Sequence, residues 1–235
     1  MFFFTRSTTL AESGFFASHI DYHSHILPGV DDGSPDVDTS RELLRALQEL
    51  GVKELWLTPH VMEDFPNSPT RLKGIFDDFK EHKDVCHGIR LHLSSEHMLD
   101  SLFVHRLHNR DLLPIIDDRH ILLETSYFNA PVGLWGVLNE IKNCGYIPVL
   151  AHPERFNYMG MSDYVTLKKE GIKFQLNYLS LLGAYGPFVS RKAVRLLVKE
   201  MYDMTGSDLH SLKGFMGCVH APIKSKLIEK LNSLH

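Results

Sequence analysis

The 235-residue sequence lacks the features of a secreted or membrane-spanning chain. Its three cysteines, Cys86, Cys144 and Cys218, are scattered without C-x-x-C spacing, which argues against a disulfide framework and favours a reducing compartment. No apolar run approaches the ~20 residues of a membrane span, and the start of the chain lacks the basic and then apolar order of a secretory signal. We therefore expect a cytoplasmic protein that does not insert into a membrane.

A strong excess of charge of one sign is also missing. The chain has 25 lysines and arginines against 29 aspartates and glutamates, so its formal net charge of −4 gives no electrostatic reason to expect nucleic acid or an anionic membrane as a partner. Internal repeats, low-complexity tracts and linkers are absent. At this length, and with 43% hydrophobic residues, one domain with one core is expected.

The sequence does contain a regular alternation of short β-prone runs and helical stretches. The predicted strands cover residues 19–24, 52–58, 89–95, 120–126, 146–151, 172–177 and 201–206, and the predicted helices cover residues 40–51, 70–85, 133–145, 161–171, 191–200 and 222–234. Such alternation predicts a parallel sheet, and about seven repeats at this length favour a small α/β barrel of the (β/α)7 type over an open sheet. The expected barrel domain spans residues 19–235 and follows a loosely ordered tail, residues 1–18.

Imidazoles and carboxylates recur where these predicted strands end. They are His23, His25, His60, Glu96, Glu124, His152, Asp208 and His210. In a parallel barrel all carboxyl ends of the strands meet at one rim, where active sites are built. Asp31 and Asp32, in the loop after the first strand, add further oxygen ligands. A set of imidazoles and carboxylates without thiolates suits Zn²⁺, Mn²⁺ or Fe²⁺, so a multinuclear metal site at the C-terminal rim is the leading hypothesis.

Several stretches resemble a known superfamily and occur in its order. They read DYHSHILPGVDDGS, TPHV, SSEHMLD, ETSYFNAP, AHPERF, QLNYLSLLGAYG and TGSDLH, and they run from His19 to His210. The chain resembles the polymerase-and-histidinol-phosphatase (PHP) superfamily. Within it, the chain is similar to the bacterial manganese-dependent protein-tyrosine phosphatases of the capsule and exopolysaccharide type.

The resemblance implies a distorted, TIM-like (β/α)7 barrel with three divalent ions at its C-terminal rim. Mn²⁺ is the expected ion, with Fe²⁺ or Zn²⁺ as alternatives. The implied ligands are His23, His25, Glu96 and Asp208 for the first ion, Glu96, Glu124 and His152 for the second, and Asp32, His60 and His210 for the third. By the same resemblance, Arg155 binds the phosphate group. Its alternative role is as the ion-pair partner of Glu154 or of an acidic residue at the rim.

One arginine of the family pattern is missing. Relatives usually carry a second arginine a few residues beyond the final SDxH, whereas this chain reads SDLHSLKGFMG. Lys213 is the nearby cation and the expected second substrate-binding residue. A lysine cannot reproduce bidentate arginine–phosphate geometry, because its ammonium group is a point charge. The departure puts catalytic efficiency and substrate preference in question.

A cysteine nucleophile is excluded by pattern, because the residues that complete C-x₅-R spacing are His92, Leu150 and Lys224. The expected nucleophile is instead a hydroxide on the ions, held by Glu96 and Asp208, with Arg155 adding charge and orientation. Three aromatic residues just beyond the strand ends can flank an aromatic substrate or pack at the rim, namely Tyr127, Phe128 and Tyr178.

Three functions remain open at this point. The first is hydrolysis of phosphotyrosine on a protein, by resemblance the tail of a bacterial tyrosine kinase that controls capsular or exopolysaccharide synthesis. The second is hydrolysis of a small phosphomonoester, as in histidinol phosphatases. The third is a catalytically weakened metal-binding protein that acts through partner contacts, and the missing arginine is its only support.

Overall fold

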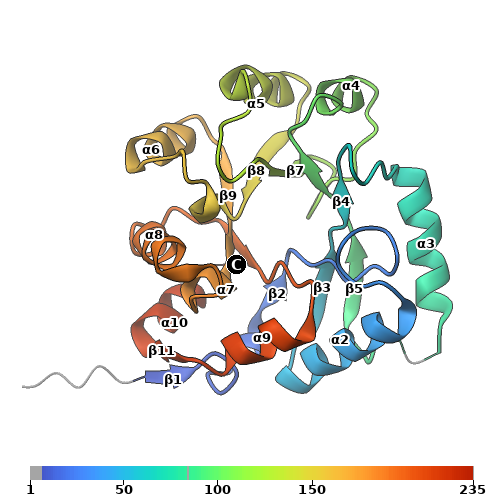
Figure 1. Ribbon diagram of the computed structural model, residues 1–235, viewed down its shortest axis with the longest axis vertical. Helices are drawn as coiled ribbons and strands as arrows, with labels where there is room; N and C mark the ends of the chain where they lie inside the picture. The colour runs from blue at the N-terminus through green and yellow to red at the C-terminus, as the bar shows by residue number, and fades with distance from the viewer. Residues whose placement is uncertain (1–6, 84, 235) are drawn as a thin grey trace, which may run out of the picture.

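The computed structural model describes residues 7–83 and 85–234, and its centre is a curled sheet of parallel strands surrounded by helices (Figure 1). The strands of this sheet are β2 (Ile20–Asp21), β3 (Glu54–Leu57), β4 (His60–Val61), β5 (Arg90–Leu93), β6 (Glu96–Met98), β7 (His120–Glu124), β8 (Ile147–Ala151), β9 (Lys173–Asn177) and β10 (Met204–Gly206). They form a six-stranded order β10-β9-β8-β7-β6-β4 and a three-stranded order β2-β3-β5, with every pair parallel.

Backbone hydrogen bonds join the two sheets on both sides. The amide of Tyr22 donates to the Thr205 carbonyl at 3.1 Å and that of Asp208 to the His23 carbonyl at 2.8 Å, next to β2 and β10. The amide of Glu96 donates to the Thr58 carbonyl at 3.3 Å, between β3 and β6. The sheet therefore curls so that the carboxyl ends of its strands face one region, as the alternation predicts for an α/β fold.

Each of the seven predicted strand runs contains a strand, but two runs are followed by a short second strand that was not predicted. β4 follows β3 after Thr58 and Pro59, and β6 follows β5 after two serines. Proline has no amide to donate to a ladder, which interrupts the strand at Pro59. These breaks shift His60 and Glu96 into strands of their own, paired in register with each other.

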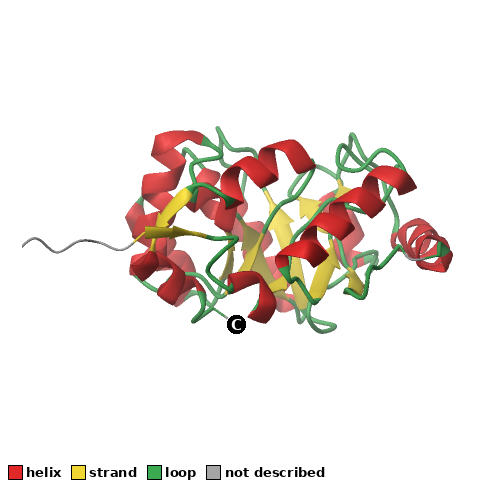
Figure 2. Cartoon of the chain, turned by 90° about the horizontal axis from the view of Figure 1, so that it is seen from below, coloured by secondary structure: helices red, strands yellow, loops and turns green. Residues whose placement is uncertain are grey.

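The helices lie on the outer side of the strands (Figure 2). They are α1 (Phe15–Ser18), α2 (Val37–Leu50), α3 (Pro69–Glu81), α4 (Phe103–His108), α5 (Leu134–Asn143), α6 (Met161–Lys169), α7 (Tyr178–Leu181), α8 (Gly186–Val198), α9 (Leu212–Val219) and α10 (Ser225–Leu231), together with the 3₁₀ turn η1 (Pro153–Arg155). In α2 the side chain of Asp36 accepts a hydrogen bond from the Thr39 amide at 2.8 Å, and Gly51 ends the helix with φ 101°. Asp36 caps the start of the helix and Gly51 its end, and both satisfy terminal backbone groups.

The expectation of a loose tail over residues 1–18 is wrong for residues 7–18. β1 (Ser7–Thr9) pairs antiparallel with β11 (Pro222–Lys224), and β11 occupies the start of the stretch that was predicted as helix over 222–234. Phe15 and Phe16 are buried and pack against Tyr178 and Phe215. Burial of two such rings removes a large apolar area from water, which stabilises this segment against the rest of the fold. Residues 1–6 lie outside the described residues. No helix in the described part of the chain is long and apolar enough to cross a membrane.

Candidate metal centre

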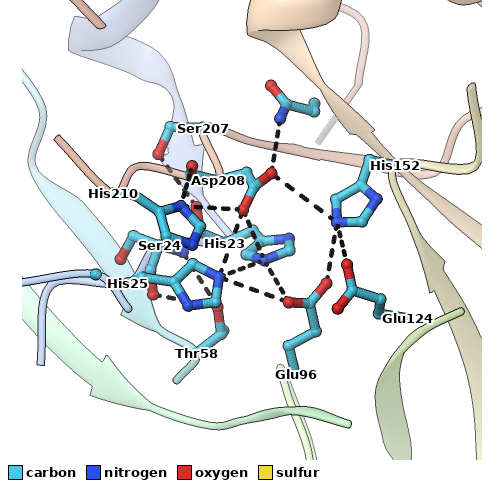
Figure 3. Close-up of polar contacts among 12 residues, drawn as sticks. His23, Ser24, His25, Thr58, Glu96, Glu124, His152, Ser207, Asp208 and His210 are labelled. Carbon is cyan, nitrogen blue, oxygen red and sulfur yellow. Dashed lines mark hydrogen bonds and ion pairs between the residues drawn. The ribbon is translucent and has the colours of Figure 1, made fainter. Parts of the chain in front are cut away.

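The nine predicted metal ligands lie together at the carboxyl ends of the strands. Within 4.8 Å of one another, their donor atoms form the groups His25–Asp32–His60–His210, His23–Glu96–His152, His23–His25–Asp208 and His60–Glu96–Glu124. Figure 3 shows seven of these side chains directed toward one another. Because some histidines and Glu96 belong to more than one group, the groups form one continuous cluster.

The donor atoms of His23, His25, Glu96 and Asp208 are spaced as ligands of one ion would be. The Nε2 atoms of the two histidines lie 3.1 Å apart. Each of them lies between 3.4 and 3.6 Å from Glu96 Oε2 and from Asp208 Oδ1. Ligand atoms at ~2.1 Å from a tetrahedral ion lie ~3.4 Å from one another, so these separations leave room for an ion at ordinary bond lengths.

Two side chains behind the histidines determine which nitrogen faces the cluster. His23 Nδ1 donates to Gln175 Oε1 at 2.9 Å, and His25 Nδ1 donates to Asp31 Oδ2 at 2.8 Å. With Nδ1 occupied in this way, Nε2 of each ring carries the lone pair that a metal needs. The sequence analysis did not single out Gln175 as functional, although a glutamine between the apolar residues Phe174 and Leu176 is a usable signal.

The two aspartates of the first loop have different positions. Asp31 is buried behind His25 and also accepts a hydrogen bond from the His60 amide at 3.0 Å. Asp32 is exposed, and its Oδ1 lies 3.5 Å from the Nε2 atoms of both His60 and His210. The geometry therefore favours Asp32 as the ligand and Asp31 as the residue that orients His25.

Glu96 and Glu124 connect the remaining histidines. His60 Nδ1 lies 3.1 Å from Glu96 Oε2 and 3.8 Å from Glu124 Oε1. His152 Nε2 lies 3.0 Å from Glu96 Oε1 and 3.6 Å from Glu124 Oε2. Thus the two oxygens of Glu96 face different histidines, which suits a carboxylate that bridges two ions. His60 presents one ring nitrogen toward Glu96 and the other toward Asp32.

The chemistry of this donor set fits divalent cations. Among the described residues, Glu96 Oε2 and His60 Nδ1 are buried without a hydrogen-bond partner, which is costly unless another group satisfies them. Burial, together with the charge of Glu96, raises the pKa of Glu124 to about 7. Burial acts in the same direction on Glu96, but the imidazoles, His23 first, hold its pKa well below the usual range. Carboxylates crowded in this way require nearby positive charge, which metal ions would supply.

The backbone at the cluster has two residues in an unusual conformation and two glycines in close contact with the histidine pair. His152 and Asp208 have φ 33° and 54°, in the left-handed region that is strained for residues with a side chain. A Cβ at Gly33 would lie 2.1 Å from the His25 carbonyl oxygen, and one at Gly206 would lie 2.4 Å from the His23 Cβ. Both glycines are needed because the histidine pair passes directly against them.

Arg155 is held inside the cluster by an acidic residue and two aromatic rings. Its Nη1 donates to Asp208 Oδ2 at 2.7 Å, and its guanidinium lies 4.0 Å from the ring centre of Tyr127 and 4.1 Å from that of Tyr185. The Tyr127 hydroxyl donates to Glu124 Oε2 at 2.7 Å. Sequence reasoning missed Tyr185, whose hydroxyl donates to Asp208 Oδ2 at 3.3 Å. Stacking between two rings fixes the plane of a guanidinium group.

Glu154, the other expected partner of Arg155, points elsewhere. It is buried and accepts hydrogen bonds from the Tyr202 hydroxyl at 3.0 Å and from the Asn177 amide at 3.1 Å. Burial raises its pKa to about 7, against the opposing effect of these hydrogen bonds. Glu154 therefore supports the turn that carries His152 and Arg155 rather than the charge of Arg155 itself.

Three other predicted positions differ in outcome. Lys213 is exposed on α9 and is not among the described residues that line the cavity above the cluster. Tyr178 is buried in the core, and its hydroxyl donates to Asp21 at 3.2 Å, so it cannot flank a substrate. Phe128 is 72% exposed. Of the predicted aromatic residues, Tyr127 is the one that lines the cavity.

The cavity above the cluster has a volume of about 520 Å³. Its polar side includes Asp32, His60, Arg155, Asp208 and His210, and its other side comes from α7, α9 and the segment that precedes α8. Because charged and apolar residues line the same cavity, a substrate can place a charged group over the cluster and an apolar group beside it.

Comparison with known proteins identifies similar chains. A sequence profile described as capsular polysaccharide synthesis, CpsB/CapC, matches residues 19–219. The tyrosine-protein phosphatase YwqE of Bacillus subtilis is 29% identical over 199 residues, which are 83% of this chain and 78% of that protein. The tyrosine-protein phosphatase CpsB of Streptococcus pneumoniae is 26% identical over 214 residues, 82% of this chain and 83% of that protein. A solved structure described as a metal-dependent tyrosine phosphatase of the YwqE and CpsB type matches with a TM-score of 0.77 at 26% identity, over 92% of this chain and 85% of the other.

Proposed function

The chain belongs to the CpsB/CapC family of capsular polysaccharide synthesis proteins, and from this premise we propose that it is a metal-dependent protein-tyrosine phosphatase. The reaction is hydrolysis of the phosphate ester of a tyrosine side chain. The observation that carries the proposal is the continuous cluster of five histidines and four carboxylates with one stacked arginine beside it.

We propose that the cluster holds three divalent ions, Mn²⁺ in the first place and Fe²⁺ or Zn²⁺ as alternatives. The proposed ligands are His23, His25, Asp32, His60, Glu96, Glu124, His152, Asp208 and His210. When bound, such ions supply a nucleophile at neutral pH and neutralise charge on the phosphoryl oxygens. The donor spacing around His23 and His25 and the unpartnered buried atoms of Glu96 and His60 support this assignment.

Arg155 is the proposed phosphate-binding residue. One of its guanidinium nitrogens is bonded to Asp208, which leaves further N–H groups of the same plane for phosphate oxygens. Because Tyr127 and Tyr185 stack on the guanidinium, little conformational freedom remains to be lost when the phosphate binds. This preorganisation partly offsets the missing second arginine.

The leaving group is a phenolate, whose conjugate acid has a pKa near ~10, so it departs more readily than an alkoxide. A dedicated general acid is therefore less necessary than for a serine ester. We further propose that the strands form a closed (β/α)7 barrel over residues 19–235. The proposed physiological substrate is a phosphotyrosine protein, namely a bacterial tyrosine kinase of capsular or exopolysaccharide synthesis.

The test is an assay of the full chain after chelation and after reloading with Mn²⁺. Its substrates are a phosphotyrosine peptide, the matching phosphoserine peptide and histidinol phosphate. We expect turnover of the phosphotyrosine peptide that disappears with the metal, as well as loss of that turnover in His152→Ala. His105→Ala, an exposed histidine on α4, is the matched control and keeps wild-type activity. Turnover that survives complete metal removal, or equal turnover of all three substrates, would contradict the proposal.

A further inference from the structure

Part of the cavity lining is built from small and apolar residues. They are Leu179, Ala184, Leu209, Gly214, Phe215 and Cys218, here called the aryl seat. They come from α7, α9, the segment before α8 and the residue after Asp208. α7 and α9 lie next to each other in the fold (Figure 1).

We propose that the aryl seat binds the aromatic ring of the substrate tyrosine and that Gly214 keeps it open. This inference rests on the proposed function and adds a specificity site to it. The only ionisable side chain of the seat is the Cys218 thiol. Burial raises its pKa, so the thiol is neutral at neutral pH. An aromatic ring with roughly 150–250 Å² of apolar surface gains from contact with such a wall.

The two sides of the cavity match the two parts of an aryl phosphate. Arg155 and the proposed metal ligands would face the charged phosphoryl group. The apolar part of the lining that a ligand can reach includes Ala184, Gly214 and Cys218, whereas Leu209 and Phe215 are almost fully buried. A phosphotyrosine places its ring directly after the ester oxygen, next to the phosphoryl group. A phosphoserine places only one methylene there, so its peptide backbone would have to enter the cavity. The seat therefore favours an aryl ester over an alkyl ester.

Gly214 is the member of the seat at which a larger side chain would most directly fill the cavity. It lines the cavity near the start of α9, and a Cβ placed on it would meet no atom within 4 Å. Glycine is disfavoured inside helices by about 1 kcal/mol relative to alanine, so helix stability does not explain its presence. A larger side chain at this position would extend into the open space that the ring is proposed to use.

Gly217 provides a matched control on the same helix. It is exposed, a Cβ on it would also meet no atom within 4 Å, and it lies outside the described lining of the cavity. A leucine at residue 217 therefore changes the composition and helix propensity of α9 in the same way as a leucine at 214. Only the 214 substitution changes the volume of the seat.

The experiment measures binding of phenylphosphonate, methylphosphonate and orthophosphate to the Mn²⁺-loaded full chain by calorimetric titration. We expect wild type and Gly217→Leu to bind phenylphosphonate about tenfold or more tightly than methylphosphonate, as hydrophobic pockets discriminate. Gly214→Leu is expected to reduce that ratio to within about twofold, mainly by weakening phenylphosphonate binding. A wild-type ratio near one, an unchanged ratio in Gly214→Leu, or the same loss in Gly217→Leu would overturn the inference.

A second substitution and a second readout guard against a folding defect. Ala184→Leu adds bulk to the seat from the segment between α7 and α8 and should lower the same ratio. Alkylation of Cys218 by a maleimide, followed by peptide mass analysis, should be slowed by phenylphosphonate more than by methylphosphonate. Cys144, which is exposed, serves as the internal reference in the same digest. Equal alkylation of Cys218 with both ligands would contradict the seat.

Failure of the seat and failure of the proposed function give different results. The binding ratio is measured without any turnover. A protein that prefers phenylphosphonate but does not hydrolyse phosphotyrosine peptides would therefore support the aryl seat and contradict the proposed function. A protein that hydrolyses phosphotyrosine but binds phenylphosphonate and methylphosphonate equally tightly would support the proposed function and contradict the aryl seat.

Discussion

Gln175 contacts the proposed metal centre from behind His23. Its Oε1 accepts a hydrogen bond from His23 Nδ1 at 2.9 Å and a longer one from the His152 amide at 3.3 Å, and its Nε2 donates to the Leu176 carbonyl at 2.7 Å. Gln175→Leu keeps nearly the same volume but leaves His23 Nδ1 buried opposite a methyl group. The ring then loses the contact that directs its Nε2 into the cluster.

Loss of this contact should change two quantities, the free energy of unfolding and the affinity for metal. Leaving one buried donor unsatisfied costs about 1–3 kcal/mol of the free energy of unfolding. Loss of a hydrogen-bond partner behind a metal-binding histidine lowers metal affinity about 10–100-fold, or roughly 1.4–2.7 kcal/mol of binding free energy. The two effects are separable, because the first is measured on the metal-free protein and the second by titration of the folded protein with metal.

The assay is a competition titration of Mn²⁺ against a chelator, combined with urea unfolding of the metal-free protein. Gln175→Glu keeps an acceptor for His23 and should retain metal affinity better than Gln175→Leu. Thr205→Val removes a buried hydroxyl from the neighbouring strand β10 and serves as the control for stability alone. If Gln175→Leu binds Mn²⁺ as tightly as wild type does, Gln175 does not orient His23 and the reasoning is refuted.

Three further predictions concern the surroundings of the cluster. Tyr185→Leu removes the ring that stacks on Arg155 and should raise KM for a phosphotyrosine peptide about threefold to tenfold, measured by steady-state kinetics. Because burial raises the folded-state pKa of Glu154 to about 7, the unfolded chain ionises first and the free energy of unfolding should fall between about pH 4.5 and 7. Glu154→Gln should reduce that fall, by up to about 3 kcal/mol. Gly33→Ala should destabilise the protein and weaken metal binding, because its Cβ would lie 2.1 Å from the His25 carbonyl oxygen.

Each of these predictions has its own control. Tyr185→Phe keeps the ring over Arg155, so a KM close to wild type is expected, and a rise equal to that of Tyr185→Leu would contradict the stacking role. An unchanged slope of stability against pH in Glu154→Gln would show that another group titrates in that window. Gly74→Ala lies in α3 with no atom within 4 Å of the added Cβ and should be neutral or stabilising, so equal damage at both glycines would refute the crowding at Gly33.

The cluster of proposed metal ligands could be predicted from the sequence because strand ends are a local property. Each β-prone run shows its own carboxyl end, and parallel alternation makes those ends converge. His23, His60 and Glu96 could therefore be placed near one another before any contact was known. The family resemblance already favoured Asp32 over Asp31 as the ligand. The contact of Asp31 with His25 needed the fold, because two adjacent residues of one loop differ only in the direction of their side chains.

Residues that act through contacts distant in the sequence could not be found in the same way. Gln175 meets His23 across 152 positions of the chain, and Tyr185 reaches Arg155 from a segment without regular secondary structure. Lys213 stood at the right sequence spacing but lies on the exposed side of α9. Phe15 and Phe16 belong to the core through contacts with Tyr178 and Phe215, which lie far along the chain.

By itself, the sequence determined the α/β alternation, the residue types of the metal centre and the family to which they are similar. Periodicity and strand ends depend on neighbouring residues, which the chain itself displays. The tertiary structure alone decided which nitrogen of each histidine faces the cluster, which rings enclose Arg155 and which helix forms the apolar side of the cavity. These are relations of side-chain direction between segments far apart, and only packing of the whole chain establishes them.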